Sequence, residues 1–280
     1  MHVARSLLAV LLALTGVAGG CSDPSPFQQL ERRFDARLGV FALDTGDGRT
    51  VEYRTDERFA YDSTVKLPAS GILLQRDSDA QLSQLITYTA AQLMSYAPIT
   101  RRHLATGMSL RDIIAAALQY SDNTAFNLIL GQLGGPAGLQ AALTAFGDQT
   151  THADRSEPDL NDAVPGDVRD TTTPRAMAAD LQKFVLGGAL SEARRTLFRD
   201  WLLANTTGGP WIRAGVPQGW IVGDKTGNGD YGTRNDIAVI WPPSRSPIIL
   251  TLYSARTTQN ANSADALLAD ATKAVVSALT

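Results

Sequence analysis

Apolar residues follow a strand-like pattern near both ends of the chain and a helical pattern in its middle. Short apolar runs bounded by glycine, proline and polar residues predict strands, and a Thr-Gly-Asp-Gly break between the first two predicts a hairpin. The predicted strands are 38–43, 51–54, 220–222, 237–241 and 248–253.

Helical spacing of apolar residues is clearest between residues 62 and 203. The same spacing occurs before the first strand and after the last one, so a helix is expected at each end of the fold. The predicted helices are 27–37, 110–118, 124–133, 137–146, 174–186, 192–203 and 264–279.

This order of elements predicts an α+β fold, a two-domain α/β sandwich. We expect residues 27–55 and 204–280 to form one antiparallel sheet with flanking helices, and residues 56–203 to form an inserted all-α domain. Residues 152–171 lack helical periodicity and contain two prolines, which predicts a long functional loop of the omega type. A functional site is expected at the junction of the two domains.

The N-terminal residues predict export. Residues 1–20 combine a basic start, an apolar run and small residues, which is the layout of a signal peptide, and residues 21–26 form a linker. The apolar run is too short to cross a membrane. Cys21 follows small residues, as at a bacterial lipoprotein cleavage site. We therefore expect a periplasmic, cell-envelope or secreted protein, with membrane attachment only through a lipidated Cys21; an incidental cysteine at an ordinary cleavage site is the alternative.

Composition removes several functional classes. The 280 residues include 25 Lys+Arg and 28 Asp+Glu without a long basic run, so nucleic acid is not an expected partner. Cys21 is the only cysteine, which excludes an intrachain disulfide. His103 and His152 lack metal-binding spacing, so no metal and no other cofactor is expected. We expect a monomer.

Candidate chemistry begins with Ser63 and Lys66. They lie three residues apart, a spacing that on a helix puts the hydroxyl and the ammonium on one face. A serine near a helix N-terminus also lies where negative charge is favoured, which suits a nucleophile. By itself the pair fits better a helix cap followed by a solvated lysine.

Two further motifs follow in order along the chain. Ser121-Asp122-Asn123 precedes a predicted helix, and Lys225-Thr226-Gly227 follows the predicted strand 220–222. Together with Ser63-x-x-Lys66 they resemble the signature shared by class A serine β-lactamases and penicillin-binding proteins.

Longer stretches extend the resemblance to almost all of the chain after the signal segment. Residues 157–161 (EPDLN) are similar to the omega-loop motif of class A enzymes, and Arg155 and Asp170 stand at the positions of that loop's structural ion pair. Tyr96 stands where the family has a cleft tyrosine, and residues 225–241 match closely. The resemblance implies hydrolysis of the β-lactam amide bond of penicillins and cephalosporins, and hence antibiotic resistance.

The resemblance also implies a role for each matching residue. Ser63 would attack the lactam carbonyl, with the N–H groups of Ser63 and Asn228 as the oxyanion hole, and Lys66 and Ser121 would relay protons. Glu157 and Asn161 would hold the deacylating water. The acylation base, Lys66 or Glu157, stays open. The residues expected to bind substrate are Tyr96, Asn123, Lys225, Thr226, Gly227, Asn228 and Arg234.

Three positions depart from the family pattern. Asp62 places an acid directly before the nucleophile, where it is expected to disfavour negative charge on Ser63. Asp62 and Gly229 also stand where some carbapenem-hydrolysing relatives carry a disulfide, which cannot form here. The side chain of Asn228 is expected to reach the substrate and to influence the preference between penicillins and cephalosporins.

Two other functions share parts of this pattern. A penicillin-binding enzyme acting on peptidoglycan D-Ala-D-Ala would carry the serine, the lysine and Lys-Thr-Gly, but residues 157–161 argue against it. A β-lactam sensor would be acylated and stay acylated, whereas a hydrolase would turn over.

Overall fold

The computed structural model describes residues 24–280, which are built around a five-stranded antiparallel sheet. The strands lie in the order β2-β1-β9-β8-β7, so the N-terminal hairpin pairs with strands from the C-terminal end through β1 and β9. This confirms the predicted α+β fold with a sheet from both chain ends. The strands are β1 (Arg37–Asp44), β2 (Thr50–Tyr53), β7 (Ile221–Asn228), β8 (Arg234–Trp241) and β9 (Ile248–Ala255).

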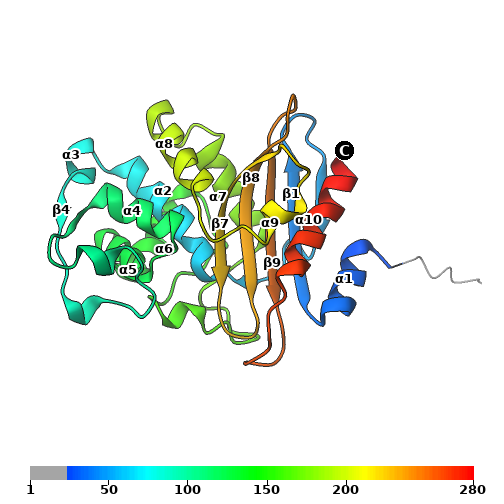
Figure 1. Cartoon of the computed structure of the whole chain (residues 1–280), viewed down its shortest axis with the longest axis horizontal. Helices are drawn as coiled ribbons and strands as arrows, with labels where there is room; N and C mark the ends of the chain where they lie inside the picture. Colours follow the sequence, from blue (N-terminus) through cyan, green and yellow to red (C-terminus); the bar gives the residue numbers. More distant parts are fainter. Residues whose placement is uncertain (1–23) are drawn as a thin grey trace, which may run out of the picture.

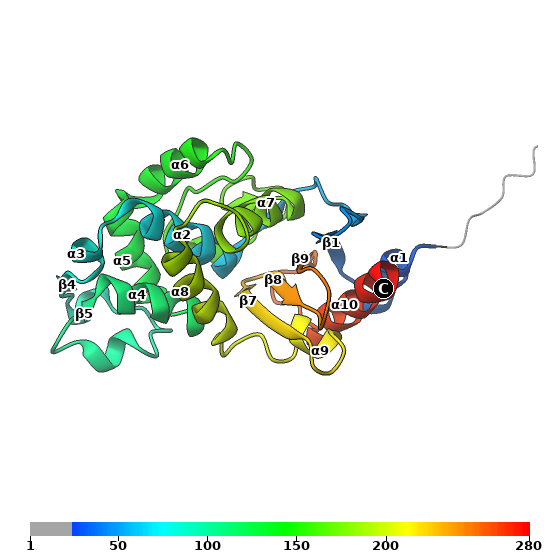
Figure 2. The ribbon, with the colours of Figure 1, turned by 90° about the horizontal axis from the view of Figure 1, so that it is seen from above.

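Helices occupy both faces of this sheet. The helices are α1 (Pro26–Phe34), α2 (Lys66–Arg76), α3 (Asp79–Leu82), α4 (Leu110–Gln119), α5 (Asn123–Leu133), α6 (Gly135–Phe146), α7 (Pro174–Val185), α8 (Glu192–Leu203), α9 (Ile212–Gly215) and α10 (Asp265–Leu279). Short 3-10 turns occur at Asp62–Val65, Ala90–Gln92, Thr100–His103 and Asp159–Asn161. Helices α1, α9 and α10 cover one face of the sheet, and the helices between α2 and α8 lie on the other side (Figures 1 and 2).

The alternation of side chains along the strands explains the two layers. Leu38 and Val40 of β1 belong to a core that includes α10, whereas Phe41 of the same strand packs into the core of the helical part. Along β8, Ala238 belongs to the core that includes α10, and Val239 belongs to the core of the helical part. The sheet is therefore buried on both faces, and the apolar runs of β8 and β9 reflect this.

The helical part contains more irregular structure than its sequence pattern predicted. Two small ladders occur there, β3 (Phe59–Ala60) with β6 (Thr171–Thr172) and β4 (Leu85–Ile86) with β5 (Met108–Ser109). Ladder β3–β6 connects the entry to Ser63 with the end of the omega-type loop, residues 152–171. The expectation of an all-α insertion is thus too simple.

Several predicted boundaries also differ, among them those of α1 and β7. Helix α1 ends at Phe34 rather than at residue 37, because Asp35 adopts a left-handed backbone (φ 46°) and Arg37 already pairs with Ala255 in the sheet. Strand β7 continues through Lys225-Thr226-Gly227 to Asn228, whereas the sequence placed this motif after the strand.

Candidate active site

Ser63 lies in the 3-10 turn that leads directly into α2, and Lys66 is the first residue of that helix. The prediction that the two side chains meet is confirmed, since Lys66 Nζ donates to Ser63 Oγ at 2.8 Å. The prediction that both residues lie on one helix is not exact, because Ser63 precedes the α-helix instead of lying within it. Both side chains are buried.

Lys66 is the centre of a dense polar cluster. Besides Ser63 Oγ, its Nζ lies 2.9 Å from Glu157 Oε1, 2.9 Å from the Ser121 carbonyl oxygen and 2.7 Å from Asn123 Oδ1. Four oxygen atoms within 3 Å favour a charged ammonium. Burial acts in the opposite direction and lowers the pKa of Lys66, while the Glu157 carboxylate partly restores it.

Glu157 approaches this cluster from the omega-type loop. Its Oε1 also lies 3.4 Å from Ser63 Oγ, and its Oε2 accepts from the Asn161 side-chain amide. Asn127 of α5 fixes the backbone of Glu157 through two 3.0 Å bonds, one to the carbonyl oxygen and one from the N–H. Asn127 was not predicted, because in the sequence it resembles any polar residue on a helix.

Arg155 and Asp170 form the ion pair predicted for this loop. The Asp170 carboxylate also accepts a 2.8 Å bond from the Tyr61 hydroxyl and bonds from the N–H groups of Asp154 and Arg155. Because Tyr61 lies two residues before Ser63, Asp170 ties the closed end of the loop to the nucleophile turn.

The Ser121-Asp122-Asn123 motif enters α5, with Asp122 as its N-cap. The fully buried Asp122 carboxylate accepts from the N–H groups of Ile99 and Thr100 and from the Thr100 hydroxyl, each at 2.9 Å. Asp122 therefore holds the 96–100 segment against α5. Tyr96 lies on that segment with half of its surface exposed.

Strand β7 supplies the remaining cation of the cluster. Lys225 is fully buried, and its Nζ donates to Ser121 Oγ at 3.1 Å and to the Thr226 carbonyl at 2.8 Å. Burial, together with repulsion from Lys66, lowers the pKa of Lys225 to about 7. The Thr226 hydroxyl bonds to that of Thr207.

Gly227 allows β7 to approach the nucleophile turn. A β-carbon at Gly227 would lie 3.1 Å from the Ser63 backbone nitrogen and 2.9 Å from the Tyr61 carbonyl oxygen. Glycine is thus needed for close packing at this position. The next residue, Asn228, is exposed and ends β7, the strand that packs against the 3-10 turn of Ser63. This arrangement brings the two predicted oxyanion-hole donors to adjacent backbones.

Arg234 lies at the start of β8, opposite Asn228 in the ladder. Its guanidinium donates to the Thr233 carbonyl at 2.9 Å and pairs with Asp265 at 3.4 Å. No hydrogen bond or ion pair joins Arg234 to Lys225 or Thr226 within residues 24–280, although all three are expected to bind substrate.

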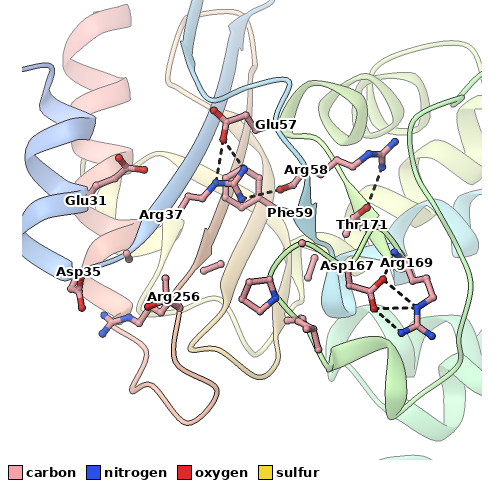
Figure 3. Close-up of a pocket in the computed structure, with 18 of the residues that line it drawn as sticks. Glu31, Asp35, Arg37, Glu57, Arg58, Phe59, Asp167, Arg169, Thr171 and Arg256 are labelled. Atoms are coloured by element: carbon pink, nitrogen blue, oxygen red, sulfur yellow. Dashed lines mark hydrogen bonds and ion pairs between the residues drawn. The ribbon is translucent and has the colours of Figure 1, made fainter.

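A cavity away from this cluster is a separate feature. It has a volume of about 770 Å³ and lies on the outer side of the omega-type loop, between that loop, the end of α1 and the end of β9. Figure 3 shows Arg37 above the Phe59 ring and Arg169 paired with Asp167 at its walls. None of Ser63, Lys66 or Glu157 lines it.

Residues 24–280 contain no group of three histidine, cysteine or acidic residues placed to hold a metal ion. They also contain no helix with the length and apolar character needed to cross a membrane. The predicted signal peptide and Cys21 lie outside the described residues.

The buried cluster defines a class of enzyme chemistry. A serine hydroxyl contacts an ammonium group, a carboxylate lies within reach of both, and backbone donors lie beside the serine. These are the parts required for acyl transfer through a covalent serine intermediate that is then released by water.

Comparison with known proteins identifies the family. The model of the beta-lactamase enzyme family matches residues 25–279. A beta-lactamase of Amycolatopsis lactamdurans is 55% identical over 94% of this chain and 88% of that relative, and one of Bacillus subtilis (strain 168) is 51% identical over 92% and 85%. The chain therefore belongs to the beta-lactamase enzyme family.

Solved structures identify the branch. The class A beta-lactamase from Clostridium kluyveri DSM 555 has a TM-score of 0.89 at 46% identity, covering 90% of this chain and 97% of that chain. A halotolerant bacterial beta-lactamase has a TM-score of 0.90 at 49% identity, covering 91% and 99%. With this fold and identity the chain is a class A serine β-lactamase.

Proposed function

We propose that this protein hydrolyses the β-lactam amide bond of penicillins and cephalosporins through an acyl-enzyme on Ser63, and thereby confers antibiotic resistance. The observation that carries the proposal is the buried contact among Ser63, Lys66 and Glu157, in which a nucleophile, a cation and a base share one cluster. The family membership of the chain supports the same reaction.

In the acylation step, Ser63 Oγ bonds to the lactam carbonyl carbon and its proton passes into the Lys66–Glu157 pair. The bond between that carbon and the lactam nitrogen then breaks, and Ser121 delivers a proton to the nitrogen. Ser121 suits this role because its Oγ lies between Lys66, at 3.4 Å, and Lys225, at 3.1 Å. The N–H groups of Ser63 and Asn228 stabilise the charge that grows on the carbonyl oxygen.

In the deacylation step, water held by Glu157 and Asn161 attacks the ester carbonyl. Glu157 takes the proton of the water, and the serine oxygen leaves and recovers a proton. The Asn127 bonds to the Glu157 backbone and the Asn161 bond to its carboxylate support this role, because they restrict the base to one orientation.

Substrate binding is proposed for the residues that surround this cluster. Lys225, Thr226 and Arg234 bind the substrate carboxylate, with Gly227 allowing the approach of β7. Asn123 accepts from Lys66 through Oδ1, which leaves its amide N–H groups for the substrate's acylamide oxygen. Tyr96 and the Asn228 side chain, both exposed, contact the rest of the substrate.

The experiment compares Ser63→Ala and Glu157→Ala with the wild-type protein, using nitrocefin turnover and mass spectrometry of the intact protein with a penicillin. We expect no turnover and no adduct for Ser63→Ala, and a stable adduct with little turnover for Glu157→Ala. Normal turnover by Glu157→Ala would show that another group is the deacylating base. A persistent adduct on the wild-type protein would instead favour the sensor.

We also propose that the chain is exported, as expected of a β-lactamase, that it is a monomer, and that Cys21 is lipidated. The division into 27–55 with 204–280 and 56–203 remains a proposal about domains. Mass spectrometry of the protein from membranes tests the lipid, and an unmodified, soluble mature protein would contradict it.

For Asn228, an unchanged penicillin-to-cephalosporin ratio of kcat/KM in Asn228→Ala would remove its proposed role in substrate preference.

A further inference from the structure

Asp62, the residue directly before Ser63, is a fully buried acid. Its backbone is left-handed (φ 46°), a conformation that aspartate and asparagine tolerate better than most residues. No ion pair compensates its carboxyl group within residues 24–280, because the nearby cations Lys66 and Arg234 pair with Glu157 and Asp265. A buried acid without a cation needs an explanation.

The Asp62 side chain connects the nucleophile turn with the β7–β8 hairpin. Its Oδ2 accepts a 2.8 Å bond from Asn235 Nδ2 on β8, and the same amide donates to the Ala60 carbonyl at 2.9 Å. Asn235 is itself fixed, since its Oδ1 accepts from the Ser254 N–H. The side-chain amide of Asn235 therefore binds the residue before Tyr61 and the residue after it.

The second carboxyl oxygen, Oδ1, faces the end of β7. It lies 2.6 Å from the point where a side chain at Gly229 would begin, and the Asn161 carbonyl oxygen lies 2.4 Å from the same point. The Gly229 N–H donates to Thr233 Oγ1 at 2.7 Å. Oδ1 has no hydrogen-bond partner among the described atoms, which leaves a position for a proton on this oxygen.

The charges around Asp62 favour its neutral form. Burial raises the pKa of Asp62 well above its usual range, and the carboxylates of Glu157 on the omega-type loop and Asp230 on the hairpin raise it further. The nearby Thr233 hydroxyl and the charge of Arg234 on β8 act in the opposite direction. Lys66 on α2 and Tyr253 on β9 are the other titratable groups that sense its charge.

We propose that Asp62 is a positioning residue for acylation that acts as an uncharged acid, holding the Ser63 turn against the end of β7 that supplies the Asn228 N–H. The proposal rests on the proposed role of Ser63 as nucleophile. It corrects the expectation that an acid beside Ser63 disfavours negative charge there, because a protonated carboxyl group carries no charge to repel it. Ionisation of Asp62 places a negative charge beside the oxyanion hole, where the reaction also develops one.

The test uses Asp62→Asn, which keeps the shape and the bond from Asn235 and is never charged, and Asp62→Ala, which loses that bond. The rate of acylation by nitrocefin is measured by stopped flow from pH 6 to pH 10. We expect Asp62→Asn to acylate within about twofold of wild type at pH 7 and to retain more activity than wild type at the alkaline end. Asp62→Ala should acylate roughly tenfold more slowly at every pH. The exposed Asp47→Asn, in the turn between β1 and β2, is the control and should behave as wild type.

An infrared measurement tests the charge state independently of catalysis. The difference spectrum between wild type and Asp62→Asn at pH 7 should contain the C=O stretch of a protonated carboxyl group. A carboxylate band in its place overturns the proposal, as does a large loss of acylation in Asp62→Asn at pH 7. Failure of the Ser63 mechanism appears separately, as an adduct that survives in Ser63→Ala. If Asp62→Ala does not fold, the infrared band and the pH dependence of acylation in Asp62→Asn still test the proposal.

Discussion

The two sides of the omega-type loop differ in what surrounds their charges. On the inner side, Lys66 and Glu157 form an ion pair with no exposed side-chain surface. On the outer side, Arg169 and Asp167 pair at the wall of the 770 Å³ cavity, with 55% of the Arg169 side chain exposed (Figure 3). This cavity therefore lies on the side where water screens the charges. Removal of charges from water distinguishes the side that carries Ser63.

The cations also differ in kind. The outer cavity is lined by arginines, whose charge does not depend on pH, whereas the inner cluster uses Lys66 and Lys225. The whole sequence contains only two other lysines, Lys183 and Lys273. Two buried lysines in an arginine-rich chain indicate that the inner cluster requires a cation whose proton is able to move.

The largest expected effect comes from removing the inner cation. Lys66→Met leaves Glu157 buried without a partner, which should lower the free energy of unfolding by about 3–5 kcal/mol. Turnover should fall by roughly 10²–10⁴-fold, since proton transfer from Ser63 loses its relay. Urea unfolding and nitrocefin turnover measure the two effects.

The matched control on the outer side is Arg169→Met, which should unfold and turn over as wild type does, because its pair is solvated. The double variant Lys66→Met/Glu157→Met should recover stability but not activity, since two apolar side chains replace a desolvated pair. Equal stability of Lys66→Met and wild type would mean that the two sides of the loop do not differ as we argue.

The pH dependence of substrate binding sharpens the contrast between the cations. With its pKa lowered to about 7, Lys225 is charged below pH 7 and loses its charge above it. Binding of the substrate carboxylate should therefore weaken about tenfold between pH 7 and pH 8.5, which appears as a rise in KM. Lys225→Arg should keep its own KM constant over this range. A KM that rises equally in Lys225→Arg and in the wild-type protein would assign the effect to another group.

The sequence predicted those parts of the fold in which burial and periodicity agree. Both ends of helix α8 (Glu192–Leu203) were predicted correctly. Its apolar residues recur at helical spacing among charged ones, and the helix begins after a serine cap. The predicted strand ended too early in β7, because the residues in the second half of this strand are polar. Lys225 and Thr226 are buried, but no rule of apolar periodicity recognises a buried polar strand end.

The site was predicted through motifs rather than through burial. The contact between Ser63 and Lys66 followed from spacing, and the Arg155–Asp170 pair followed from resemblance. Asn127 and the connecting role of Asp62 were not predictable, because their functions depend on partners 30 and 173 residues away. Long-range partners of polar residues leave no periodic signal in one sequence.

A smaller effect is expected where the loop meets the nucleophile turn. Gly229→Ala introduces a β-carbon 2.4 Å from the Asn161 carbonyl and 2.6 Å from Asp62 Oδ1, so the loop must move. We expect roughly fivefold slower deacylation and a loss of about 1 kcal/mol in stability, the low end for overpacking. Single-turnover kinetics separate deacylation from acylation. Unchanged rates would show that the inner side tolerates displacement of Asn161.

The smallest effect is expected at Gly166, on the outer limb of the same loop. Gly166 has a left-handed backbone (φ 85°), but a β-carbon there would meet no atom within 4 Å. Gly166→Ala should therefore lower the free energy of unfolding by about 1 kcal/mol through backbone strain alone, and Gly166→Asn by less. Because no contact changes, deacylation should stay within about twofold of wild type in both variants. Urea unfolding and single-turnover kinetics test this directly. Slower deacylation in Gly166→Ala would mean that strain in the outer limb reaches Glu157, and the two sides of the loop would then act as one unit.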